Sequence, residues 1–106
     1  MRTSKRKRLQ AAGWKVGDAK TFLGLSDEEA ALVEMKLALA GHLRRRRLAR
    51  HVSQVKLAGQ LGSSQSRVAK MEAADASVSL DLLVKALLAL GETPRGLARI
   101  LGSRAA

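Results

Sequence analysis

The side chains best suited to recognise a ligand in this 106-residue chain lie between positions 65 and 70. Gln65, Arg67 and Lys70 carry an amide, a guanidinium and an ammonium group, and a hydroxyl is added by Ser66. A glutamine amide can pair with N6 and N7 of adenine, and arginine or lysine can donate to O6 and N7 of guanine. The chemistry that this group predicts is hydrogen bonding to flat polar edges such as those of bases, without a catalytic step.

Two short helices joined by a tight corner are expected to position these side chains. The first helix begins after Ser53, whose hydroxyl can cap it, and ends before Gly62, which adopts a left-handed conformation at little cost. The second helix begins after Ser64, another capping residue. Val68 and Met71 lie three residues apart and form its apolar stripe, so the polar side chains of this helix are expected to point outward.

This segment resembles the helix-turn-helix of Cro/C1-like (XRE-type) DNA-binding proteins. The resemblance is carried by eight residues at the family's spacing: Gln54, Leu57, Ala58, Leu61, Gly62, Val68, Met71 and Glu72. In that family a small residue at the position of Ala58 lets the helices cross closely, and a β-branched residue at the position of Val68 wedges between them. The resemblance implies an all-α, compact five-helix bundle of the lambda-repressor-like kind that binds double-stranded DNA and regulates transcription as a repressor.

The resemblance also implies roles for individual residues. The base-facing residues carried over from the family are Gln65, Ser66, Arg67 and Lys70, while Gln54 corresponds to a residue that holds a phosphate and braces the first recognition glutamine. Ser53 and Ser64 are expected to add phosphate contacts at helix N-termini. The alternative for Arg67 and Lys70 is that they only make an exposed face soluble.

An arginine run precedes the first short helix, and the resemblance separates its members. In the family, an arginine five residues before the apolar position of Val52 forms a buried ion pair with the glutamate that closes the recognition helix. These two positions are Arg47 and Glu72, so their expected role is structural. The other arginines are expected to be more exposed, with Arg44 and Arg46 as DNA contacts; they are Arg44, Arg45, Arg46 and Arg50.

The remaining helices are predicted from caps and apolar periodicity. Ser26 and Glu29 form a capping box that opens a helix from Asp27 to about Arg50. One stripe of this helix is expected to face the helix-turn-helix: Leu32, Met35, Leu39 and Leu43. A second stripe needs another cover, either the segment of Trp14 and Phe22 or another subunit: Val33, Leu37, Ala40 and Leu48. Ser79 and Thr93-Pro94 are expected to open the last two helices.

Composition indicates the class of partner and excludes several kinds of site. The chain has 20 Lys and Arg against 9 Asp and Glu, a net charge of +11 that favours a polyanion such as nucleic acid. It has no cysteine, and His42 and His51 are too far apart for a helical metal motif, so no metal, cofactor or enzymatic activity is expected. No apolar run is long enough to span a membrane, and a cytoplasmic location is expected.

The N-terminal part is predicted to be distinct from the helix-turn-helix domain of residues 26–106. Residues 1–25 divide into a basic arm, which either lies along phosphates or only improves solubility, and a small apolar segment. This apolar segment is a candidate surface for a partner and contains Trp14, Val16, Phe22 and Leu23.

Most of residues 5–50 resembles the leader of small XRE regulators of the HigA-like antitoxin group. This resemblance implies a second role, in which the protein neutralises a RelE/HigB-like RNase toxin while repressing the shared operon. The alternatives are a phage-type or metabolic XRE repressor without a toxin partner, and a protein-only interaction module. Because one helix-turn-helix reads few base pairs, a DNA-binding form is expected to be a homodimer on an inverted repeat.

Overall fold

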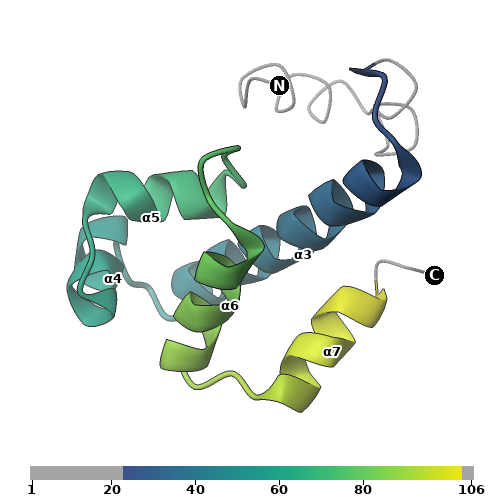
Figure 1. Cartoon of the computed structure of the whole chain (residues 1–106). Helices are drawn as coiled ribbons and strands as arrows, with labels where there is room; N and C mark the ends of the chain where they lie inside the picture. Colours follow the sequence, from purple (N-terminus) through teal and green to yellow (C-terminus); the bar gives the residue numbers. More distant parts are fainter. Residues whose placement is uncertain (1–22, 104–106) are drawn as a thin grey trace.

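Five helices follow one another in the part of the chain that the structure describes, residues 23–103 of a computed structural model (Figure 1). They are α3 (Asp27–Ala49), α4 (Gln54–Leu61), α5 (Gln65–Glu72), α6 (Leu80–Ala89) and α7 (Pro94–Ser103). The long helix α3 packs against α5, α6 and α7, while α4 packs against α5. The predicted all-α bundle with a helix-turn-helix at α4 and α5 is therefore confirmed.

Serine side chains fix the starts of four helices, as the sequence predicted. Ser26 and Glu29 form the expected capping box, in which each side chain accepts a hydrogen bond from the backbone N–H of the other at 3.0–3.1 Å. The hydroxyls of Ser53, Ser64 and Ser79 likewise accept from the third backbone N–H of α4, α5 and α6. These bonds satisfy amides that have no partner inside their own helix, so each start is set locally.

At the ends of α4 and α5 the chain changes direction through a residue in the left-handed conformation. Gly62 has φ 64° after α4, and the next amide returns to the carbonyl of Ala58 at 2.8 Å. After α5 the left-handed residue is Ala74, with φ 52°, and the Asp75 amide returns to the carbonyl of Lys70 at 3.0 Å. This backbone pattern satisfies the last carbonyls of each helix and turns the chain sharply, which lets α5 cross α4.

The hydrophobic core lies where the second half of α3 meets the other helices. Its largest fully buried side chains come from α3, α5 and α6: Leu39, Leu43, Met71, Leu83, Leu87 and Val68. Ala58 of α4 is only 3% exposed and belongs to the core, as the family resemblance implied for a small residue at this position. The inner faces expected for α3 and α5 are confirmed at Leu39, Leu43, Val68 and Met71.

The first half of α3 departs from its predicted stripe. Leu32 is 47% exposed, whereas Leu39 and Leu43 of the same stripe are fully buried. The core on α3 begins at Leu37, because the other helices cover the later turns of this long helix. In the second stripe Ala40 is buried but Leu48 is 46% exposed.

Replacing Gly59 by alanine is expected to raise the free energy of unfolding by about 1 kcal/mol, because glycine is that much worse than alanine inside a helix. Gly59 is exposed in α4, and apart from its neighbours in the helix backbone a Cβ at this position would meet no atom within 4 Å. Urea denaturation measures the gain. Gly62→Ala is the matched control and should lose stability, because alanine would have to keep a φ of 64°. A loss of stability in Gly59→Ala would contradict the open space at this site.

Candidate nucleic-acid interface

Helix α5 divides into a buried face and an exposed polar face. Val68 and Met71 are 0% and 1% exposed and anchor the helix in the core. The four residues predicted to face bases all lie on the exposed side: Gln65, Ser66, Arg67 and Lys70. The scaffold thus holds an amide, a hydroxyl and two cations outward on a rigid helix, the arrangement that reading base edges in a major groove requires.

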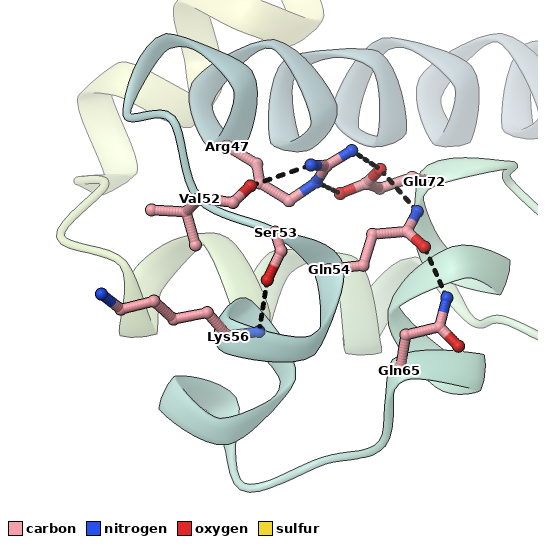
Figure 2. A network of polar contacts seen from close by, with 7 residues as sticks. All are labelled: Arg47, Val52, Ser53, Gln54, Lys56, Gln65 and Glu72. Carbon is pink, nitrogen blue, oxygen red and sulfur yellow. Dashed lines mark hydrogen bonds and ion pairs between the residues drawn. The ribbon is translucent and has the colours of Figure 1, made fainter.

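A buried ion pair holds α5 against the end of α3 (Figure 2). Arg47 donates from Nε to Oε2 of Glu72 at 2.6 Å and from Nη2 to Oε1 at 3.0 Å, so the contact is bidentate. The side chains of Arg47 and Glu72 are only 11% and 3% exposed. The hydrogen bond to Glu72 raises the pKa of Arg47 above its usual value, which keeps the guanidinium charged. Arg47 Nη1 also donates to the carbonyl of Val52 at 2.9 Å, so the same side chain holds the chain entering α4.

Two glutamines extend this ion pair to the protein surface. Gln54 donates from Nε2 to Oε1 of Glu72 at 3.1 Å, and its Oε1 accepts from Nε2 of Gln65 at 2.7 Å. The contact between Gln54 and Gln65 is the brace that the family resemblance implied. The bond between Gln54 and Glu72 was not foreseen, because it depends on how the first turn of α4 meets the last turn of α5.

The capping serines lie at the edges of the same surface. Ser53 and Ser64 are exposed at the N-termini of α4 and α5, where the backbone N–H groups and the helix dipole favour an anion. Both hydroxyl oxygens already accept a capping bond, at 3.0 Å from Lys56 N and 3.2 Å from Arg67 N. Each hydroxyl keeps its own hydrogen for donation, which suits the phosphate role that the sequence predicted.

A hollow beside the exposed face of α5 was not predicted from the sequence. It has a volume of about 330 Å³ and is lined by residues of α5, the following loop and α6: Ser64, Ser66, Arg67, Lys70, Ser77, Val78 and Leu82. Ser77 is held by Asp75, whose carboxylate accepts from both the backbone N–H and the hydroxyl of Ser77. An Asp-x-Ser spacing in a loop of small residues was the local signal for this turn.

The structure corrects the expectation for Arg46. Arg44, Arg45 and Arg50 are exposed, but Arg46 is half-buried and turned toward the corner between α6 and α7. Its Nη1 donates to Oε2 of Glu92 at 2.8 Å, and its Nη2 donates to the carbonyl of Leu90 at 3.0 Å. Arg46 therefore links α3 to the last two helices, and this use of its guanidinium replaces the phosphate contact expected for it.

Glu92→Gln is expected to destabilise the fold at neutral pH and to matter less in acid. The Glu92 carboxylate also accepts from His42 Nε2 at 2.9 Å, and bonds to His42 and the charge of Arg46 lower the pKa of Glu92 below its usual value. A lowered pKa gives stability that is present above the ordinary value of 4.5 and is lost as the pH falls through the folded-state value. Urea midpoints of the two proteins should differ at pH 7 and converge as the pH falls below 4.5 through the lowered folded-state pKa of Glu92. A difference in urea midpoint that stays constant over this pH range would show that stability does not depend on the ionisation of Glu92.

The candidate partner surface of the N-terminal segment is only partly described. Trp14, Val16 and Phe22 lie outside residues 23–103, and Leu23 is half-buried just before α3. Within residues 23–103 no three His, Cys, Asp or Glu side chains gather as metal ligands. No helix in that range is long and apolar enough to cross a membrane.

Comparison with known proteins points to the same segment as the geometry. A helix-turn-helix family model (HTH_3) matches residues 43–97, from the second half of α3 into α7. No curated protein and no solved structure matches the chain. The matched segment covers half of the chain and contains α4 and α5, including the exposed polar face of α5. The chain therefore belongs to the XRE-type helix-turn-helix family of DNA-binding transcriptional regulators, which is not an enzyme family.

Proposed function

We propose that this protein is a sequence-specific repressor that inserts α5 into the major groove of an inverted-repeat operator. The observation that supports this proposal is the division of α5, whose apolar residues are fully buried while its base-pairing side chains are exposed. Gln65 is held in place by Gln54, so one contact to a base edge is positioned before DNA arrives. Such positioning reduces the entropy that binding must overcome.

Phosphate contacts are proposed for three parts of the chain. Ser53, Gln54 and Ser64 lie at the N-termini of α4 and α5, and Arg44 supplies an exposed cation on α3. The third place is the N-terminal sequence, because residues 1–22 carry seven Lys and Arg against one Asp. More than half of the net charge of +11 therefore precedes the described helices and is available for a DNA backbone.

Operator binding is expected to weaken steeply with salt, because each neutralised phosphate contributes a slope of about −0.9 in log K against log salt. Fluorescence anisotropy on a labelled duplex between 50 and 200 mM salt, roughly the range over which such contacts are measured, gives this slope. Removing residues 1–8 should make the slope shallower if the basic arm lies along phosphates. A slope near zero for the full chain would contradict the proposed backbone contacts.

The operator and the oligomeric state can be tested together. Selection from randomised duplexes should enrich an inverted repeat with half-sites about 34 Å apart, one turn of DNA, because a dimer places two α5 helices on one face of the duplex. Sedimentation of the complex should then give two protein chains per duplex. Enrichment of no sequence would contradict specific recognition, and one chain on a single half-site would contradict the dimer.

A narrower role, as the antitoxin of a toxin–antitoxin pair, is proposed from the resemblance of residues 5–50 to HigA-like leaders. Leu32, which is 47% exposed in the first half of α3, is a candidate apolar contact for such a partner. An antitoxin should copurify with a small RelE/HigB-like protein encoded beside it and should inhibit its RNase activity. A repressor without such a neighbour corresponds to the phage-type or metabolic alternative, and the proposed DNA binding is the same in both cases.

A further inference from the structure

The amide of Gln65 has a defined orientation although the residue is exposed. Its Nε2 points inward and donates to Gln54, and Figure 2 shows its oxygen directed away from the network. An amide in this orientation presents to a ligand one acceptor oxygen and the second hydrogen of Nε2. This pattern matches N6–H and N7 of adenine, whereas guanine offers two acceptors, N7 and O6, at the same edge.

The orientation follows from a residue two steps away. Glu72 is held as an ion pair by Arg47, and an ionised carboxylate only accepts hydrogen bonds. Gln54 must therefore turn Nε2 toward Glu72, which leaves its Oε1 on the side of Gln65. Because Oε1 of Gln54 is an acceptor, Gln65 must donate to it from its own Nε2. The three side chains thus form a chain of donors and acceptors whose direction is fixed by the buried charge.

We infer that Glu72 sets the base preference of Gln65 for adenine over guanine by fixing the direction of the Gln54 and Gln65 amides. Glu72 does not reach DNA and acts as a positioning residue. The inference rests on the proposed DNA recognition by α5, and it adds a specificity determinant that lies in the protein interior. The ion pair between Arg47 and Glu72 therefore has a role in specificity that is separate from its role in stability. A neutral side chain at position 72 could either accept a hydrogen bond from Gln54 or donate one to it, and would not fix the direction of the Gln54 amide.

Base selection on variant proteins tests the inference. The base pair read by Gln65 is at the operator position where the Gln65→Ala protein no longer prefers one base pair over another. There the unchanged protein should prefer adenine over guanine by about 5–150-fold, the range of one good bidentate contact. Glu72→Gln should lower this ratio toward 1 at that position only. A folded Glu72→Gln protein with the original ratio, or an original preference for guanine, would overturn the inference.

Gln54→Met provides a second test that keeps the ion pair. It interrupts the chain of hydrogen bonds between Glu72 and Gln65 and should cause the same loss of preference for adenine. Gln60→Met is the matched control, because Gln60 is an exposed glutamine on the same helix and outside the network. Unchanged base preference in Gln54→Met would overturn the inference, and so would an equal loss in Gln60→Met.

A measurement without DNA separates this inference from the proposed function and does not require Glu72→Gln to fold. In nuclear magnetic resonance spectra, the side-chain amide hydrogens of Gln54 and Gln65 should exchange with solvent more slowly than those of Gln60. The protection of Gln65 should disappear in Gln54→Met. If the side-chain amide hydrogens of Gln65 exchange as fast as those of Gln60 in the unchanged protein, the amide of Gln65 is not held in the proposed orientation and the inference is wrong. Failure to select any operator, with this protection present, would instead count against DNA recognition.

Discussion

Replacing Glu72 by alanine is expected to lower the free energy of unfolding by about 3–5 kcal/mol, the cost of removing one partner of a buried ion pair. The guanidinium of Arg47 would remain nearly enclosed, having lost two hydrogen bonds to the carboxylate. The substitution also frees Nε2 of Gln54, so a second polar group in the same place loses its partner. Urea or thermal denaturation at neutral pH measures the loss.

Asp81→Ala is the control for that experiment. Asp81 pairs with Lys85 at 3.3 Å, but both side chains are more than 70% exposed, so its removal should cost less than about 1 kcal/mol. The comparison separates the effect of burial from the effect of losing a carboxylate. Equal stability of Glu72→Ala and the unchanged protein would show that the Arg47–Glu72 pair contributes nothing to the fold.

Alanine at Arg67 or at Lys70 is expected to weaken operator binding by about 5–150-fold each, the range for a base contact worth 1–3 kcal/mol. Both side chains lie on the exposed face of α5, so their removal should leave the core intact. Anisotropy titrations on the selected operator measure the loss, and thermal denaturation shows whether the fold is unchanged.

The same charge change elsewhere on the surface provides the comparison. Arg99 is exposed on α7, which packs against α3 rather than belonging to the helix-turn-helix. Arg99→Ala should retain near-wild-type affinity apart from a small effect of net charge. If the Arg67 and Lys70 variants bind as tightly as Arg99→Ala, these two residues serve only to make the surface soluble.

The helices of this fold could be predicted because their determinants are local. Ser26 with Glu29, and Ser53, Ser64 and Gly62 around the corner, fix starts and ends through neighbours a few residues away. The exposed side of α5 was also predictable, because Val68 and Met71 define the opposite face. The assignment of these exposed residues to base contacts remains a prediction.

The orientation of individual polar side chains could not be read from the sequence. Four consecutive arginines, Arg44–Arg47, look alike along the chain, and their roles depend on what each side of α3 meets after folding. Arg46 meets Glu92, 46 residues away, and Arg47 meets Glu72, 25 residues away. The family resemblance supplied the second pairing, whereas no local pattern indicates the first.

The length of α3 has a consequence for how two ligands share the protein. Leu32 lies 15 residues before Arg47, which corresponds to about 22 Å along a helix at 1.5 Å per residue. Arg47 contacts α5 through Glu72 near the end of α3, whereas Leu32 lies outside the core in the first half of the same helix. If a partner docks at Leu32 and does not extend to the Arg47 end of α3, binding of the partner and of DNA at the same time, rather than competition, is the expected outcome when both ligands are present.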